Sequence, residues 1–120
     1  MVFVYLFTGA FGEIIQSPLN AAMAVGDEMV FNCSSSSTGA ITWVYTTDCK
    51  SAVGIALTDG NCDITSSHTS HYRTEKPCGF VCNLVVFDAL LSHGGCYICA
   101  DGFGLGRQLS AFLIVVGRYM

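Results

Sequence analysis

The chain has 120 residues, enough for one domain with a buried core but too few for two. Hydrophobic residues make up 52% of it and charged residues only 12%, and its mean hydropathy is +0.53. Soluble domains usually carry about twice that charged fraction, so we expect an apolar surface that a partner covers. A net charge of −4 argues against nucleic acid as the partner, since nucleic-acid binding needs clustered basic groups.

The seven cysteines indicate an oxidising compartment, and hence an extracellular protein that is secreted or held at the cell surface. Because seven is odd, at least one thiol is free, paired between chains or paired outside this sequence. No apolar run reaches the roughly 18 residues of a membrane-spanning helix, so we expect any membrane anchor beyond Met120. The apolar segment Met1–Phe7 lacks the basic residues of a signal peptide. We expect residues 1–16 to form an arm or extra strand, 17–117 the domain, and 118–120 its C-terminal end.

Short runs of alternating apolar and polar side chains predict an all-β chain, and no segment has a convincing helical period. Turn residues at Gly26-Asp27, Thr58–Asn61 and Gly102–Gly106 separate several of these runs. In one run, Phe80, Cys82, Leu84 and Val86 share the inward parity. The expected strands lie, in chain order, within 28–33, 41–46, 52–57, one or two edge strands in 62–74, then 80–86, 94–101 and 108–116.

The most specific pattern is Cys33, Trp43 and Cys99, with Tyr97 two residues before the second cysteine. With the segments GDEMVFNC (26–33) and Gly95-x-Tyr97-x-Cys99, this pattern resembles a V-set immunoglobulin domain. The resemblance implies a V-type Greek-key sandwich of about nine antiparallel strands. It also implies a Cys33–Cys99 disulfide between the sheets, and alternation points both cysteines inward. The expected core around that disulfide contains Trp43, Tyr97, Leu84 and Val86.

The tail Phe103-Gly104-Leu105-Gly106 looks like the FGxG element of a joining segment. A V domain with such a tail is similar to the VJ-type immunoglobulin receptors of invertebrate chordates. An alternative is that these glycines build a hairpin turn, because only three residues separate Cys99 from Phe103. His93 stands where the family usually has an aspartate paired with an arginine. We therefore expect a hydrogen-bonded corner residue there and assume no ion pair with Arg73.

The other cysteines leave alternatives open. Cys49–Cys96 and Cys49–Cys62 are both candidate pairs, while Cys82 could be a buried core thiol. A zinc site built from Cys78-x3-Cys82, Cys96-x2-Cys99 and nearby histidines is disfavoured, because an extended strand puts Cys96 and Cys99 on opposite faces. No nucleophile elbow or comparable catalytic group occurs in the sequence. We expect no enzyme activity and no cofactor.

Asn32-Cys33-Ser34 matches the N-glycosylation sequon, and Asn32 is expected to face outward. The sequence alone favours an unused sequon, because Cys33 is expected to be consumed by its disulfide.

The resemblance implies that the outer face of the sheet carrying Trp43 and Tyr97 meets a partner. A face that is poor in charge and rich in aliphatic side chains suits a packed interface, and a homodimer is the commonest symmetric solution. A second V domain is the other candidate partner. The expected interface residues are Val44, Thr46, Ile55, Ile98, Phe112 and Ile114. The expected ligand loops contain Ser36, Thr38, Asp59, Asn61, Asp101 and Phe103.

The predicted function is therefore immune-type recognition by an antigen-receptor-like domain that meets an unidentified protein or glycan ligand. The alternative is a homophilic adhesion module, or a secreted immunoglobulin domain that binds glycans or microbes with the sheet face itself.

Overall fold

The computed structural model describes residues 14–35, 41–50, 54–77, 80–101 and 108–117. These residues form ten strand segments and two short 3-10 helices, and β4 continues β3 across Asn32-Cys33, which gives nine strands. The expected all-β class is confirmed. The elements are β1 (Ile14–Gln16), β2 (Ala21–Ala24), β3 (Met29–Phe31), β4 (Ser34–Ser35), β5 (Ile41–Thr46), β6 (Ile55–Ala56), η2 (Ser66–His68), β7 (Tyr72–Glu75), β8 (Asn83–Val86), η3 (Leu91–His93), β9 (Gly95–Asp101) and β10 (Gln108–Val116).

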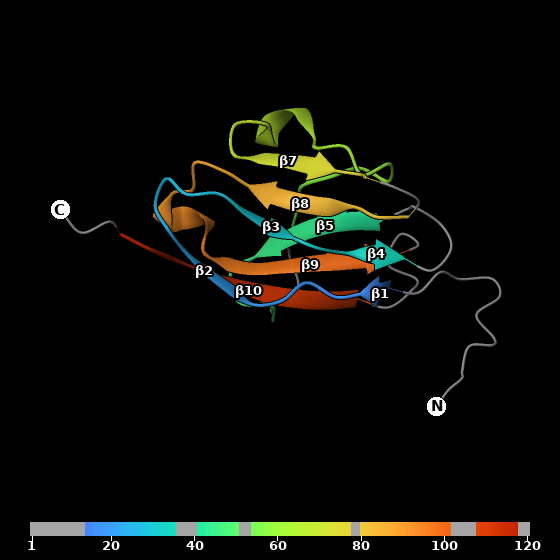
Figure 1. The fold of residues 1–120 in the computed structure, drawn as a ribbon, viewed down its shortest axis with the longest axis horizontal. Coiled ribbons are helices and arrows are strands. Elements are labelled where there is room, and N and C mark those ends of the chain that lie inside the picture. Colours follow the sequence, from blue (N-terminus) through green and yellow to red (C-terminus); the bar gives the residue numbers. More distant parts are fainter. Residues whose placement is uncertain (1–13, 36–40, 51–53, 78–79, 102–107, 118–120) are drawn as a thin grey trace.

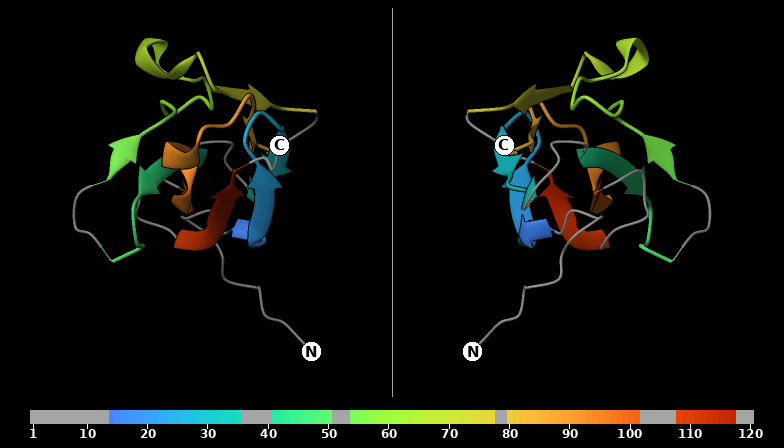
Figure 2. Two further views of the ribbon diagram at one scale, coloured as in Figure 1. Left: turned by 90° about the vertical axis from the view of Figure 1, so that its left-hand side faces the viewer. Right: turned by 90° about the vertical axis from the view of Figure 1, so that its right-hand side faces the viewer.

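The strands form a two-layered sandwich (Figure 1). The front sheet has the order β2-β10-β9-β5-β6, and the back sheet has the order β3-β8-β7. The short pair β1–β4 continues the back sheet, because Ser34 bridges to Val81 and the Ser35 N–H donates to the Phe80 carbonyl. Figure 2 looks along the strands from either end and shows the front sheet curving from β6 round to β2.

Side chains that alternate inward from both sheets fill the space between them. Phe31 and Leu84 from the back sheet and Trp43 and Tyr97 from the front sheet are fully buried, as is Val86. The Phe31 ring centroid lies 6.2 Å from that of Trp43 and 5.2 Å from that of Tyr97. Such aromatic pairs each contribute about 0.5–1.5 kcal/mol beyond the area they bury. The core therefore lies where the alternation predicts it.

Val85 is buried although alternation places it on the outer face of the back sheet. It pairs laterally with Arg73 on β7 and Val30 on β3. The Arg73 guanidinium reaches across β8 to Glu28, with Nη2 and Oε2 3.0 Å apart, and it lies 5.5 Å from the Phe87 ring centroid. The ion pair and the Arg73 stem thus cover this part of the back sheet.

The structure differs from the predicted arrangement in its edges. The β2–β10 pairing is parallel, because the chain crosses from the back sheet at β1 to the front sheet at β2. Among the described residues between β5 and β7, only β6 is an edge strand. The following segment carries the isolated bridge Thr58–Ile64 and the helix η2 instead of a second one. Phe80, expected to be inward, is 44% exposed, because it lies at the end of the back sheet, beyond β8 and opposite Ser35.

β1 lies within the segment expected to be an arm or an extra strand. The rest of that segment, 1–13, and the end at 118–120 lie outside the described residues.

Candidate functional site

The candidate site is built on the centre of the front sheet, where Trp43 on β5 pairs with Cys99 on β9. Cys99 is joined to Cys33, with Cα atoms 6.6 Å apart, and this disulfide ties the two sheets together. The Trp43 indole N–H donates to the Cys82 carbonyl at 3.0 Å, and the Trp43 backbone N–H donates to Thr58 Oγ1 at 2.9 Å. All four polar groups are thereby satisfied in the buried centre, which fixes the position of the front sheet.

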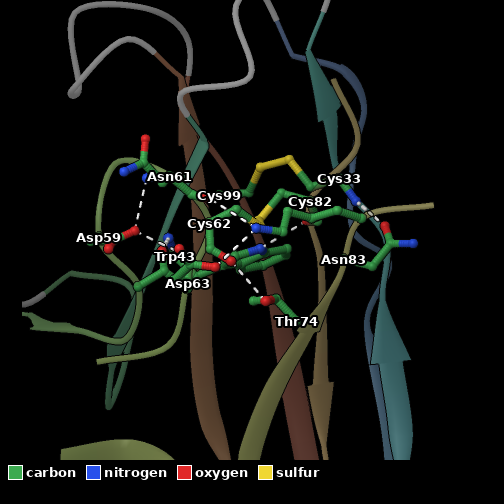
Figure 3. The surroundings of a disulfide bond; sticks show 12 residues. Cys33, Trp43, Asp59, Asn61, Cys62, Asp63, Thr74, Cys82, Asn83 and Cys99 are labelled. Atoms are coloured by element: carbon green, nitrogen blue, oxygen red, sulfur yellow. Dashed lines mark hydrogen bonds and ion pairs between the residues drawn. A yellow bond between two sulfur atoms is a disulfide. The ribbon is translucent and has the colours of Figure 1, made fainter. Parts of the chain in front are cut away.

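A second disulfide lies beside the first. Cys62 and Cys82 are joined with Cα atoms 6.0 Å apart, and both residues are buried next to Trp43 (Figure 3). The Thr74 hydroxyl donates to the Cys62 carbonyl at 2.7 Å and holds the other side of the loop. Cys82 is therefore half of a disulfide, and the idea that it is a free core thiol is wrong. The bridge draws the segment after β6 into the core, which explains why no further edge strand forms in its described part.

A third disulfide joins Cys49 to Cys96, with Cα atoms 5.2 Å apart. This is one of the two pairs considered for Cys49, and it excludes Cys49–Cys62. Cys82, Cys96 and Cys99 are all in disulfides, so the zinc site that the sequence disfavours lacks three of its four thiolates. Among the described residues no cluster of three or more metal-ligating side chains occurs. Cys78, the cysteine that takes part in none of these three disulfides, lies outside the described residues.

The hydroxyl of Tyr97 ties β9 to the corner that precedes it. Tyr97 Oη donates to the His93 carbonyl at 2.7 Å and shares a 2.8 Å hydrogen bond with Tyr72 Oη. Burial raises the pKa of Tyr97 and of Tyr72, so both phenols remain protonated and act as neutral hydrogen-bonding groups. The entry of β9 is thus held rigidly against the back sheet.

His93 is the hydrogen-bonded corner residue that the sequence predicts. Its Nδ1 accepts a hydrogen bond from the Leu90 N–H at 2.8 Å, and its ring centroid lies 4.6 Å from that of His71. Burial lowers the pKa of His93, and the nearby His71 acts in the same direction. Arg73 pairs with Glu28 and Glu75 and not with His93.

The outer face of the front sheet, which we call the front face, can be assigned from the strand register, since directly opposed residues share a face. The row Ser110–Ile98–Val44–Ala56 crosses β10, β9, β5 and β6, and the row Phe112–Cys96–Thr46 runs beside it. Ile114 and Val116 continue the front face towards β2, opposite Ala22 and Ala24. None of these front-face residues is charged.

Three apolar side chains of β10 stand out from the front face. Phe112 is 42% exposed, Ile114 59% and Val116 51%. Val44 and Ile98 are half-buried beside them. Burying such side chains against a partner would stabilise a complex by roughly 25 cal/mol per Å² of apolar area removed from water.

Two of the six expected interface residues are placed differently. Thr46 is only 4% exposed, because the turn after β5 folds back over it. The Cys49 N–H donates to Thr46 Oγ1 at 2.9 Å, and Cys49 is anchored on Cys96. Ile55 pairs with Tyr45 and so has inward parity, while Ala56 shares the front face with Val44. Ile55 is exposed because it lies at the sheet edge.

The expected ligand loops lie largely outside the described residues, since Ser36, Thr38 and Phe103 are not described. Their flanking strand ends are adjacent, because Ile41 pairs with Asp101. The turn at Asp59 is described: Asp59 Oδ1 accepts hydrogen bonds from the Asn61 N–H at 2.8 Å and the Asp63 N–H at 3.1 Å. These bonds lower the pKa of Asp59, so its carboxylate is charged and holds the turn. The Asn61 side chain is exposed (Figure 3).

No pocket is found in the described part of the chain, so its candidate binding surfaces are an exposed face and turns. The described helical segments include none that is long and apolar enough to cross a bilayer.

Comparison with solved structures identifies this architecture. The first Ig domain of the mouse polymeric immunoglobulin receptor superposes with a TM-score of 0.70 at 16% identity, covering 90% of this chain and 98% of that one. The chain has an immunoglobulin fold. Dpr1 IG1 bound to DIP-eta IG1 gives a TM-score of 0.68 at 17% identity, over 88% of this chain and 95% of that one. A titin–obscurin-like 1 Ig complex gives a TM-score of 0.65 at 16% identity, over 93% of this chain and 100% of that one.

At these identities the likeness establishes the immunoglobulin fold and nothing finer. No family model and no curated protein matches the sequence. Within the immunoglobulin fold, the Tyr97 hydroxyl bond to His93 is the tyrosine corner, in which the tyrosine two residues before the second cysteine bonds back to the preceding corner.

Proposed function

We propose that this immunoglobulin domain is a variable-type recognition module of an extracellular, antigen-receptor-like protein, and that it pairs with a second copy of itself through the front face. The observation that carries the proposal is the charge-free front face with Phe112, Ile114 and Val116 standing out from it. Solvent alone does not favour such a surface, whereas the core of a protein interface is depleted of charge and rich in aromatic and aliphatic groups.

The extracellular location is supported by the three disulfides among the described residues. Such bonds form and persist in oxidising compartments and are rare in the cytosol. The variable type rests on the sequence motifs around Cys33, Trp43 and Cys99. The glycine-rich segment that resembles a joining element, 103–106, lies outside the described residues. The proposal assigns ligand contacts to the loop end of the domain, where Asp59 and Asn61 lie.

A second immunoglobulin domain as the partner is supported by similar structures whose names describe Ig domains in complex with one another, Dpr1 with DIP-eta and titin with obscurin-like 1. Self-pairing around a twofold axis would bring the same face of each copy together, so each exposed β10 side chain would count twice. The front face of one copy would then bury the apolar row of the other.

The test is a matched pair of variants measured by light scattering coupled to size exclusion. Ile114→Glu places a carboxylate on the front face, and Val30→Glu places one on the outer face of the back sheet, where Val30 is 39% exposed. Burying an unpaired carboxylate in each copy costs several kcal/mol, so Ile114→Glu should weaken the dimer by about 100-fold or more. Val30→Glu should remain as dimeric as the unmodified protein.

Both side chains are exposed, so both variants should fold, which Trp43 fluorescence checks. A dimer that survives Ile114→Glu would overturn pairing through this face. An adhesion module would give a different result, because front-face variants would abolish self-association and ligand binding together.

A further inference from the structure

The back sheet carries an N-glycosylation sequon, Asn32-Cys33-Ser34, that the proposed recognition function does not use. Asn32 lies between β3 and β4, and it continues the exposed side of an alternation in which Glu28 and Val30 are exposed while Phe31 and Cys33 are buried. Among the described residues none forms a hydrogen bond with its side-chain amide. Asn32-Cys33-Ser34 has the sequon N-x-[ST], whose asparagine accepts N-linked oligosaccharide in secreted proteins.

We propose that Asn32 carries an N-linked glycan. The donor is an oligosaccharide linked to a lipid diphosphate. The Asn32 side-chain amide nitrogen attacks the anomeric carbon of the first sugar, the carbon–oxygen bond to the diphosphate breaks, and the lipid diphosphate leaves with its electron pair. The amide nitrogen gives up one proton, and an N-glycosidic bond remains. This inference rests on the extracellular location in the proposed function but not on dimerisation.

The disulfide at Cys33 is the obvious objection, and the order of synthesis answers it. The partner, Cys99, lies 66 residues later in the chain. At a synthesis rate of roughly 5–20 residues per second, about 3–13 s pass between the appearance of the two cysteines. During that interval the native disulfide cannot form, and the sequon is an unstructured peptide. Ser34 becomes buried only when β4 pairs with β1 and with Val81, which lies later in the chain.

The folded domain also accommodates a glycan at this place. The pairings Phe31–Leu84 and Ser34–Val81 put Asn32 opposite Asn83, and Asn83 lies opposite Glu75 on β7. The neighbours of Asn32 across the sheet are therefore polar, unlike those on the front face. Since packed sheets lie about 10 Å apart, a glycan on the back sheet projects away from the front face and leaves it free to pair.

The experiment expresses the whole chain behind a secretory leader in eukaryotic cells and measures intact mass before and after peptide-N-glycosidase treatment. Secreted and retained protein are both analysed. The expected result is a mass increase of one oligosaccharide that the enzyme removes, leaving aspartate at position 32. Asn32→Gln removes the acceptor and Ser34→Ala removes the sequon while keeping Asn32, so both should lack the increase.

An unmodified Asn32 in protein that has entered the secretory pathway would overturn the proposal. The double variant Cys33→Ala, Cys99→Ala tests whether the glycan is transferred before the disulfide closes. If it is, the variant should carry glycan at an occupancy within about twofold of that of the unmodified chain. If glycan appeared only in that double variant, disulfide closure would precede transfer and the inference would fail. Failure here would leave dimerisation through the front face intact, and a glycosylated monomer would refute only the pairing.

Discussion

Removing the Cys62–Cys82 disulfide gives a quantitative test of how this fold is stabilised. The bridge spans a sequence separation of 20 residues. For a loop of that length the chain-entropy relation gives about 3.3 kcal/mol at 25 °C, and the double variant Cys62→Ala, Cys82→Ala should lose about that much free energy of unfolding. The hydrogen bonds from Thr74 and from the Trp43 indole use backbone carbonyls of these residues and survive the substitution. The measured loss therefore reports mainly on the bridge.

The assay is guanidinium unfolding followed by the fluorescence of Trp43, the single tryptophan and a fully buried one. All proteins carry Cys78→Ser, so that no thiol remains to exchange. The comparison is Cys49→Ala, Cys96→Ala, whose bridge spans 47 residues and should contribute about 4 kcal/mol. A loss below about 1 kcal/mol for the Cys62 and Cys82 variant, with an unchanged denaturant slope, would refute the reasoning.

Three further predictions use the same unfolding assay. Tyr97→Phe deletes the buried hydroxyl that bonds His93 and Tyr72, and it should lower the free energy of unfolding by about 2 kcal/mol. Tyr45→Phe deletes a half-buried hydroxyl that donates to the Gly94 carbonyl at 2.6 Å, and it should cost about 1 kcal/mol. Equal losses would contradict a special role for the Tyr97 corner. Gly95→Ala puts a Cβ 2.6 Å from Tyr45 Oη at a φ of +148° and should destabilise the fold by about 2 kcal/mol or more. Gly94→Ala, whose Cβ has its nearest contact at 3.4 Å, should cost less than about 1 kcal/mol. The reverse order of losses would contradict the tight approach of Gly95 to Tyr45. Burial lowers the pKa of His93 below 6.5, so on acidification the unfolded chain binds a proton before the folded protein does. The free energy of unfolding should therefore fall as the pH drops below 6.5, and it should level off once His93 also titrates in the folded protein. His93→Asn should flatten this pH dependence. An unchanged slope in that variant would assign the acid sensitivity elsewhere.

The centre of the fold is predictable because it obeys local rules. Trp43 and Tyr97 lie on strands long enough for alternation to fix their inward direction, and Cys33 keeps the same alternation between β3 and β4; all three are buried as expected. His93 is likewise predictable as a corner residue, since it follows the last strand of the back sheet and precedes Gly94-Gly95.

Elsewhere the outcome depends on contacts that alternation does not encode. Cys62 adopts a positive φ of 65° in a turn, where period-two parity has no meaning, so its pairing with Cys82 is invisible in the sequence. Cys49, also at positive φ, reverses the chain and covers Thr46, which parity alone would leave exposed. Ile55 changes face because the length of the preceding turn, rather than its own neighbours, sets the register of β6.

On the front face, too, the direction of the side chains is predictable from the sequence and the contact with a partner is not. The outward direction of Phe112 and Ile114 is set by the regular alternation of β10, the longest of the described strands, and both are exposed. That this face pairs with a second copy stays a proposal, because pairing involves a second surface that the alternation of β10 does not encode.

The most direct test of that central claim is the molar mass of the unmodified domain in solution, measured by light scattering over a concentration series with and without mild reductant. Pairing through the front face predicts a concentration-dependent dimer that reductant leaves intact. A monomer at every concentration would contradict it, and a dimer that reductant abolishes would assign the association to an interchain disulfide.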